Sequence, residues 1–267
     1  MNTEKTRMHF TDNYLLNPTN PVSINVIGAG GTGSKLLTAL MEMSHSLIAL
    51  GHAGLQVRLW DDDIVTEANL GRQRFAQCET GLYKSVAIIN RINRCEGTNW
   101  KAETARFEKN TLGKLPENVG TSIYISCVDS VKARFEIADI LNGLDNSKTY
   151  LNRPLYWLDF GNSQHTGQVV LSTIGTVKQP KSEKYETVAD LPFITDEFGE
   201  LLKQSETTDD TPSCSLAEAL ERQDLYINSS LVPMGCSLLW NLFRNGLTPY
   251  KGFFHNLKDF RTQPIPV

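Results

Sequence analysis

The sequence predicts an α/β fold with a doubly wound, mostly parallel sheet. Short apolar strands alternate along the chain with segments whose apolar residues recur at helical spacing. A glycine-rich turn, Gly28-Ala29-Gly30-Gly31-Thr32-Gly33, stands between the first such strand and the first such helix. Gly28, Asp61 and Asp129 each directly follow a predicted strand. Because ligands of such sheets bind beyond the carboxyl ends of the strands, these positions also predict where a ligand binds.

Each predicted element has its own pattern. The first strand, 23–27, precedes the glycine turn, and the helix that begins near Thr32 carries apolar residues four apart, such as Leu36 and Leu40. Further strands are expected at 55–60, 122–128, 156–160, 168–173 and 252–257, and further helices at 82–95, 131–141, 215–224 and 228–245. Residues 1–20 are polar and contain Asn-Pro twice, which predicts an irregular lead-in.

The length of the chain suits one domain. Its 267 residues are enough to bury a large core, and we expect a single domain over 1–267. Residues 178–212 change character, because Lys, Glu, Thr, Asp and Pro dominate there and only short apolar islands interrupt them. We interpret 178–214 as a long mobile loop that crosses the face on which the ligand binds.

Composition and charge favour a protein that binds neither nucleic acid nor membrane. Hydrophobic residues make up 40% of the chain and charged residues 21%, and the net charge is −4. Lys and Arg form no cluster that would bind nucleic acid. No apolar run approaches the ~20 residues that span a bilayer, and the first residues lack the apolar core of a signal peptide. A cytoplasmic location is therefore expected.

Cysteine usage argues against disulfides and against zinc. The five cysteines are Cys78, Cys95, Cys127, Cys214 and Cys236. They are widely spaced and odd in number, whereas a disulfide framework uses an even set. No Cys-x-x-Cys pair occurs, so no structural zinc is expected.

The glycine turn has the pattern of a phosphate-binding site. Gly28, Gly30, Gly31 and Gly33 let the backbone turn tightly and approach a ligand without a Cβ in the way. The helix that follows presents unpaired N–H groups and the positive end of its dipole to an anion. The turn therefore predicts a bound nucleotide, but it leaves the activity open because many unrelated activities share this pattern.

The segment 61–73 narrows the choice of activity. It reads Asp-Asp-Asp-Ile-Val-Thr-Glu-Ala-Asn-Leu-Gly-Arg-Gln. An NAD-dependent dehydrogenase would also use an acidic residue after the second strand, here Asp61, to hold the ribose. It does not need Asn69, Arg72 and Gln73 just beyond. The segment thus argues against a dehydrogenase.

Two further motifs complete an ordered series. Gly-x-x-Lys occupies 81–84, and Asp-x-x-x-x-Arg occupies 129–134. With the glycine turn and 61–73, the series resembles the adenylating superfamily of ThiF, MoeB and the ubiquitin-activating enzymes. The resemblance covers about 22–175, weakens over 178–210 and resumes towards the C-terminus. It implies a Rossmann-like sheet with an antiparallel C-terminal portion and a crossover loop.

The resemblance implies Mg-ATP chemistry. Members of the superfamily activate a carboxylate by its attack on the α-phosphate of ATP, which releases pyrophosphate. By resemblance, Arg72 and Lys84 contact the phosphates and are catalytic, and Asn69 makes a polar contact nearby. Asp61 binds the ribose and Asp129 holds Mg²⁺. The ATP-binding set implied also includes Asp63, Gln73, Gly28, Gly30, Gly31 and Gly33.

Some of these acidic and basic residues also have plainer interpretations. Asp62 is interpreted as a solvated neighbour, because one acid suffices for a ribose. Asp63 could merely cap the next turn. Lys84 alone would be a surface charge, but its spacing from Arg72 favours a function. Arg134 could simply pair with a surface acid.

Cys214 is the candidate nucleophile for a second step. Pro-Ser-Cys-Ser-Leu at 212–216 resembles the Pro-x-Cys-Thr-Ile/Leu motif of members that form thioesters, with Ser in place of Thr. Ser215 and Glu218 have the spacing of a capping box, which predicts a helix from residue 215. A thiol just before a helix N-terminus has a lowered pKa and could attack an acyl adenylate. The plainer alternative is a loop cysteine without chemistry.

The chain also departs from the family pattern. The zinc-binding cysteine pairs of many members have no counterpart in this sequence, and Arg7 is only a weak match to the arginine that reaches a neighbouring subunit. The compact chain resembles most the PRTRC-system ThiF family proteins of bacteria. That resemblance implies a ubiquitin-like protein and a conjugating-enzyme-like protein as partners, and a homodimer.

The leading hypothesis is therefore an enzyme that adenylates the C-terminal carboxylate of a ubiquitin-like protein and accepts it on Cys214 as a thioester. One alternative is activation of a small-molecule carboxylate or of one borne on tRNA, although the acidic net charge disfavours tRNA. Another is a nucleotide-binding module without turnover. The intact set of Arg72, Lys84 and Asp129 argues against that module.

Overall fold

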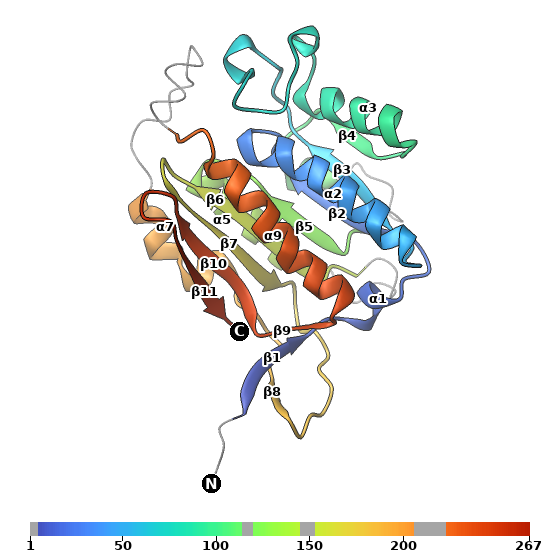
Figure 1. Cartoon of the computed structure of the whole chain (residues 1–267), viewed down its shortest axis with the longest axis vertical. Coiled ribbons are helices and arrows are strands. Elements are labelled where there is room, and N and C mark those ends of the chain that lie inside the picture. Colours follow the sequence, from blue (N-terminus) through green and yellow to red (C-terminus); the bar gives the residue numbers. More distant parts are fainter. Residues whose placement is uncertain (1–4, 114–119, 145–152, 206–222) are drawn as a thin grey trace.

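A computed structural model describes residues 5–113, 120–144, 153–205 and 223–267. Its main body is an eight-stranded sheet with the order β11-β10-β7-β6-β5-β2-β3-β4 (Figure 1). The strands are β2 (Val22–Ile27), β3 (Leu55–Trp60), β4 (Lys101–Glu103), β5 (Ile123–Ser126), β6 (Tyr156–Asn162), β7 (Thr166–Thr173), β10 (Tyr250–Asn256) and β11 (Arg261–Pro266). Strands β4, β3, β2, β5 and β6 run parallel, whereas β7, β10 and β11 continue the sheet antiparallel. The predicted mostly parallel sheet with an antiparallel C-terminal portion is confirmed.

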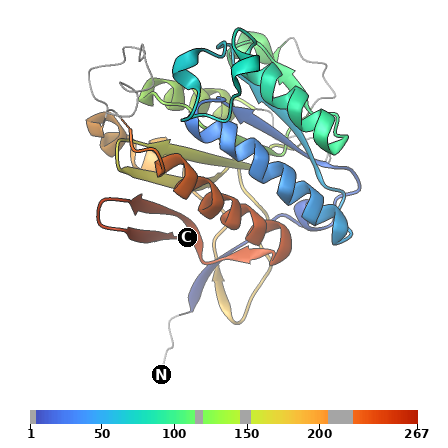
Figure 2. The same ribbon diagram turned by 45° about the horizontal axis from the view of Figure 1, so that its top comes forward.

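Helices cover both faces of the sheet (Figure 2). One face carries α2 (Gly31–Ala49), α3 (Lys84–Glu96) and α9 (Ile227–Arg244), and the other carries α5 (Val131–Asn142), α6 (Ile194–Glu197) and α7 (Gly199–Ser205). Alternation along β5 separates the two cores, because Ile125 packs with the first set and Tyr124 with the second. Both faces of the central strands are therefore buried, as a doubly wound sheet requires.

The predicted helices follow from their apolar stripes and caps. Leu36 and Leu40 of α2 are fully buried against the sheet and α9. The side chain of Ser130 accepts a hydrogen bond from the Ala133 N–H and caps α5. Helix α3 ends at Gly97, whose φ of +64° is favoured by glycine. These three helices begin or end within three residues of their predicted bounds.

The N-terminal residues are not the irregular lead-in that the sequence predicted. Strand β1 (Thr6–Phe10) forms a small sheet with β8 (Tyr185–Thr187) and β9 (Leu247–Thr248), and helix α1 (Asn13–Leu16) follows. His9 is fully buried there. Its ring nitrogens lie 2.7 Å from the Val188 carbonyl and 2.8 Å from the Tyr156 hydroxyl. These partners come from distant parts of the chain, so no local pattern predicts the strand.

Residues 178–205 also differ from the predicted loop over the ligand-binding face. Strand β8 pairs with β1, which contacts Tyr156 at the amino end of β6, the end opposite the predicted site. Phe193 stacks edge-on against Trp157 with ring centroids 5.0 Å apart, and Ile194 is buried beside it. The short apolar islands therefore dock this stretch on the sheet. Residues 206–214 and most of the predicted helix 215–224 lie outside the described residues.

Short elements complete the described part of the chain. They are α4 (Lys109–Leu112) and the 3₁₀ turns η1 (Glu67–Asn69) and η2 (Gln77–Glu79). Among the helices of the described ranges, none has both the length and the apolar character that crossing a membrane requires.

Candidate functional site

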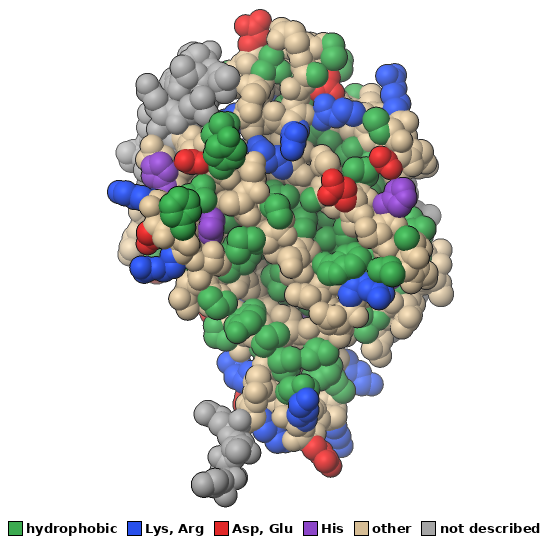
Figure 3. Space-filling model, viewed as in Figure 1, with side chains coloured by type: hydrophobic (Ala, Val, Ile, Leu, Met, Phe, Trp, Pro, Cys, Tyr) green, Lys and Arg blue, Asp and Glu red, His purple; other side chains and the backbone are tan. Residues whose placement is uncertain are grey.

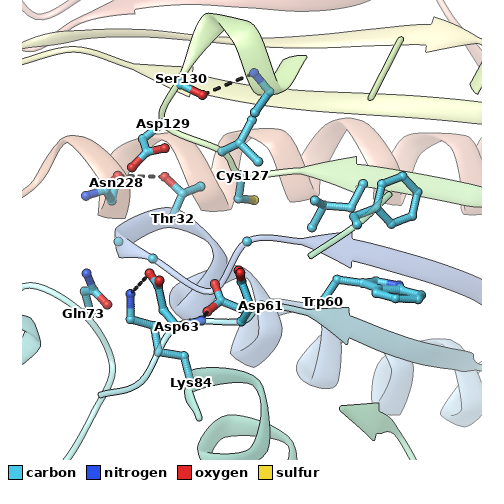
Figure 4. Close-up of a pocket in the computed structure, with 18 of the residues that line it drawn as sticks. Thr32, Trp60, Asp61, Asp63, Gln73, Lys84, Cys127, Asp129, Ser130 and Asn228 are labelled. Carbon is cyan, nitrogen blue, oxygen red and sulfur yellow. Dashed lines mark hydrogen bonds and ion pairs between the residues drawn. The ribbon is translucent and has the colours of Figure 1, made fainter. Parts of the chain in front are cut away.

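A cavity of about 430 Å³ opens at the carboxyl ends of the parallel strands (Figure 4). Its walls come from the carboxyl ends of β2, β3 and β6, from the segments that follow β2, β3, β4 and β5, and from the first turns of α2, α3, α5 and α9. Gly28, Asp61 and Asp129, which the sequence placed at the ends of three strands, all line it. The structure thus brings together residues that lie far apart in the chain, at the edge where doubly wound sheets bind ligands.

The glycine turn is tightly packed on one side and open on the other. Gly28 has a φ of +96°, and a Cβ on Gly33 would lie 1.9 Å from the Gly28 carbonyl oxygen. A Cβ on Gly30 would meet nothing within 4 Å, and Gly30 lines the cavity. Helix α2 begins at Gly31, so its free first-turn N–H groups lie at this wall. The turn therefore combines a fixed backbone with room for an anion.

Asp61 ties the end of β3 to the glycine turn. Its carboxylate accepts hydrogen bonds from the Ala29 N–H at 2.6 Å and from the Asp63 N–H at 3.0 Å. Burial raises the pKa of Asp61 to about 6, although the Ala29 N–H and the nearby charge of Lys84 oppose the rise. Asp61 is a partly desolvated acceptor, which suits hydroxyl groups of a ligand.

Lys84 and Asp63 meet inside the cavity (Figure 4). The Lys84 ammonium lies 2.7 Å from the Asp63 carboxylate. The lysine side chain is 9% exposed, whereas the aspartate side chain is 68% exposed. Lys84 is the first residue of α3, and its backbone N–H also donates to the Asp63 carbonyl. The plain interpretation of Lys84 as a surface charge is therefore wrong.

Arg72 and Gln73 present polar atoms that lack partners among the described residues. The Arg72 Nε and the Gln73 Oε1 are buried without a hydrogen bond, and both residues line the cavity. The Arg72 Nη1 donates to the Gln223 side chain at 3.0 Å. Burial lowers the pKa of Arg72, while the charge of Asp129 across the cavity raises it. Buried polar atoms without partners at a cavity wall are typical of a site that a ligand completes.

Asp129 follows β5 and stands exposed at the cavity wall. Within the ranges that the structure describes, no group of three or more His, Cys, Asp and Glu side chains could hold a metal ion. Magnesium commonly binds through one or two carboxylates and takes its other ligands from phosphate and water. The exposed carboxylate of Asp129, whose charge acts on Arg72, fits that mode.

Three further residues singled out in the sequence lie outside the cavity, are exposed at its wall, or are buried in an ion pair. The Asn69 Oδ1 accepts from the Thr66 N–H and hydroxyl within η1, and Asn69 does not line the cavity. Its contact to phosphates stays a prediction. Asp62 lines the cavity but is exposed, as expected of a solvated neighbour. Arg134 is buried and pairs at 3.1 Å with Asp159, which is itself buried, so its partner is not a surface acid.

The described cysteines are poor nucleophiles or lie outside the cavity. Burial raises the pKa of Cys127, which lines the cavity, and raises that of Cys236 to about 12. Cys78 and Cys95 are both exposed. Cys214 lies outside the described residues.

Several side chains at the site escaped the sequence analysis. Asn162, Gln223 and Asn228 line the cavity, and Lys35 contacts two residues that line it. The Lys35 ammonium donates to the carbonyls of Gly31 and Arg72, and burial lowers its pKa to about 8. Each of these residues reaches the site through tertiary packing and belongs to none of the motifs above.

The family model described as "ThiF family" matches residues 12–256. The chain belongs to the ThiF family. It is 25% identical over 170 residues to "Ubiquitin-like modifier-activating enzyme 5" of Oryza sativa subsp. japonica, a match that covers 59% of this chain and 36% of that protein. This ThiF-family chain therefore spans about a third of the length of that curated relative.

Solved structures share the fold. PaaA matches with a TM-score of 0.58 and 15% identity over 92% of this chain and 64% of the PaaA chain. E. coli MccB, crystallised with MccA, matches with a TM-score of 0.54 and 13% identity over 95% of this chain and 65% of the MccB chain. At sequence identities this low, the likeness shows a shared fold and nothing about activity.

Proposed function

We propose that this ThiF-family protein is an adenylating enzyme that uses ATP. The convergence of the α2 N-terminus, Arg72 and Lys84 on one cavity carries the proposal. Transfer of an adenylyl group concentrates negative charge on the phosphates, and fixed cations and helix N–H groups stabilise such charge. E. coli MccB, a neighbour in fold, has been crystallised with AMPCPP, an analogue of ATP.

In the proposed reaction a carboxylate oxygen attacks the α-phosphorus of ATP, and the bond to the bridging oxygen of pyrophosphate breaks. Asp61 would accept hydrogen bonds from the ribose hydroxyls, and the open wall at Gly30 would admit the phosphates. Arg72 and Lys84 would offset the negative charge of the pentacoordinate transition state at phosphorus and of the leaving pyrophosphate. Asp129 would hold Mg²⁺, which supplies further positive charge on the phosphates.

The proposed substrate is the C-terminal carboxylate of a ubiquitin-like protein. The support is the similarity to "Ubiquitin-like modifier-activating enzyme 5" and the series of motifs. In the second step the Cys214 thiolate would attack the carbonyl carbon of the acyl adenylate and AMP would leave, forming a thioester. A conjugating-enzyme-like protein would receive the acyl group in the cytoplasm.

We further propose a homodimer. Hydrophobic side chains are spread over the face that α2 and α9 cover, as Figure 3 shows. The large apolar side chains that are exposed include Ile48 and Leu50 at the end of α2 and Tyr226 just before α9. We infer that apolar surface on this face contributes to the dimer contact.

ATP–pyrophosphate exchange tests the proposed activity. Exchange that depends on a ubiquitin-like protein with a free C-terminus is expected, and amidation of that C-terminus should abolish it. No exchange with any carboxylate would contradict adenylation, whereas exchange with small carboxylates alone would contradict the protein substrate. A thioester band that persists in Cys214→Ala would contradict the role of Cys214.

A further inference from the structure

Two side-chain amides connect the glycine turn to Arg72. The Thr32 hydroxyl donates to the Asn228 Oδ1 at 2.7 Å, and the Asn228 Nδ2 donates to the Gln223 Oε1 at 3.1 Å. The same Gln223 Oε1 accepts from the Arg72 Nη1 at 3.0 Å. Asn228 belongs to the first turn of α9, and Figure 4 shows it facing Thr32. We call Asn228 and Gln223 the amide pair.

The chemistry of the partners fixes the direction of both amides. An arginine guanidinium has donors only, so Gln223 must turn its oxygen towards Arg72. Asn228 must then turn its nitrogen towards that same oxygen, which leaves its own oxygen for the Thr32 hydroxyl. Reversing Gln223 would set a donor against the Arg72 donor, and reversing Asn228 would set two acceptor oxygens against each other. The Arg72 guanidinium is thus held by one acceptor, while its Nε has no partner among the described residues.

Close packing locks the amide pair in place. Asn228 is 1% exposed, and a Cβ on Gly31 would lie 2.5 Å from the Asn228 Nδ2. Gly31 therefore lets the first turn of α9 approach the start of α2. The buried Asn228 amide, bonded at both ends, has one orientation and passes it to the half-buried Gln223, which holds the guanidinium.

The neutrality of Gln223 is also significant. A neutral acceptor orients Arg72 without cancelling its charge, so the full charge stays available to an anion in the cavity. A carboxylate in the same place would form an ion pair with Arg72 and compete with the anion.

We propose that Asn228 and Gln223 are positioning residues that hold Arg72 ready for the phosphates of the nucleotide. The proposal rests on the proposed function, because Arg72 must bind phosphate for its orientation to matter. The amide pair acts through Arg72.

Titration of the purified full chain with Mg-ATP, and separately with pyrophosphate, tests this role. Gln223→Ala should raise both dissociation constants roughly three- to ten-fold, the range that the loss of one ordinary hydrogen bond implies. Gln223→Glu should raise them further. Asn241→Ala is the matched control, because Asn241 is on the same helix but bonds to Asn245, and it should change neither constant.

A double-mutant cycle separates positioning from mere structural support. In an Arg72→Ala background, Gln223→Ala should have no further effect on pyrophosphate binding, since the group it orients is gone. Asn228→Ala should weaken binding to a similar degree as Gln223→Ala, and combining the two should add little. The thermal midpoint of each variant reports whether it folds, and Gln223→Ala, at a half-buried position, serves if Asn228→Ala does not fold.

The possible results are distinct. Binding that is unchanged or tighter in Gln223→Ala, or an effect that adds fully to that of Arg72→Ala, would overturn the positioning role. A wild-type protein that binds pyrophosphate but does not catalyse exchange would overturn the proposed function alone. A wild-type protein that binds neither probe would overturn both.

Discussion

The buried ammonium of Lys84 lies 2.7 Å from the exposed carboxylate of Asp63, and both residues line the cavity. The two side chains differ in solvent exposure, because water reaches the carboxylate but scarcely reaches the ammonium. A ligand anion could therefore replace the Asp63 carboxylate without desolvating the lysine again. The relationship leaves Lys84 as a buried cation whose partner an anion could replace.

Lys84→Met is expected to lower the rate of ATP–pyrophosphate exchange by about 10²- to 10³-fold, the usual effect of removing one group that stabilises transition-state charge. The methionine keeps the apolar stem of the side chain, so the thermal midpoint should change little. Lys203→Met is the matched control, because Lys203 pairs at 2.9 Å with Glu200 on the surface. Equal rates in wild type and Lys84→Met would contradict the assignment.

Asp61 predicts a pH dependence of nucleotide binding. Its pKa is raised to about 6 by burial, so the carboxylate that would accept from ribose hydroxyls is lost as the pH falls through 6. The dissociation constant of Mg-ATP should therefore rise between pH 7 and pH 5. Calorimetry on Asp61→Asn should show weaker binding of Mg-ATP, with a dissociation constant that does not change around pH 6. If the dissociation constant rises equally in wild type and in Asp61→Asn as the pH falls, the pH dependence belongs to another group.

The same shift predicts the sign of a stability effect. Because the native state binds the Asp61 proton more tightly than the unfolded chain, its contribution to the free energy of unfolding is fully present below pH 3.8 and is lost as the pH rises through about 6. Asp61→Asn should therefore gain stability relative to wild type as the pH rises from 4 to 7. Urea unfolding at several pH values measures the difference.

Replacement by alanine at two glycines of the same turn should affect stability in one case and ligand binding in the other. In Gly33→Ala the new Cβ would lie 1.9 Å from the Gly28 carbonyl oxygen, so the turn must shift and the protein should unfold more easily. In Gly30→Ala the methyl group enters open space at the cavity wall, so the fold should persist while Mg-ATP binds more weakly. Thermal unfolding and calorimetry on both variants check this. A nucleotide affinity unchanged in Gly30→Ala would place the phosphates elsewhere.

Arg134 should support the fold rather than the reaction. Its side chain is 5% exposed and that of Asp159 is 1% exposed, so Arg134→Met would leave a buried carboxylate without its cation. Such a loss costs about 3–5 kcal/mol of unfolding free energy. Arg106→Met, which breaks an exposed pair with Glu136, should cost at most about 1 kcal/mol. Denaturant titrations of both variants measure the contrast.

The sequence alone could place those polar residues of the candidate site that directly follow a strand. Asp61 and Asp129 could be placed in the site because strand ends meet at one edge of a parallel sheet, and motif spacing added Arg72 and Lys84. Asn228 could not be found in this way, because its partner Thr32 is 196 residues away and their contact depends on how α9 docks on α2.

The same limit explains the errors in the fold. Strand β1 was missed because its partners lie in β8 and β9, near residues 185 and 247, and three of its five residues are polar or charged. The apolar islands after residue 190 were too short to show helical periodicity, yet Phe193 and Ile194 bury themselves against the sheet. Docking of such islands depends on the surface that receives them.

The reversal of strand direction at β7 has a consequence for the rim of the cavity. Beyond β6 the sheet ends in hairpin turns, and the Leu257 N–H after β10 donates to the His165 carbonyl in the turn between β6 and β7. The neighbouring Gln164 carbonyl accepts from the Asp224 N–H, close to the start of α9. Hairpin turns tolerate exchange better than strand ends that carry helices. The rim of the cavity therefore combines strand ends whose geometry is fixed by the helices they carry with hairpin turns that could be exchanged more freely.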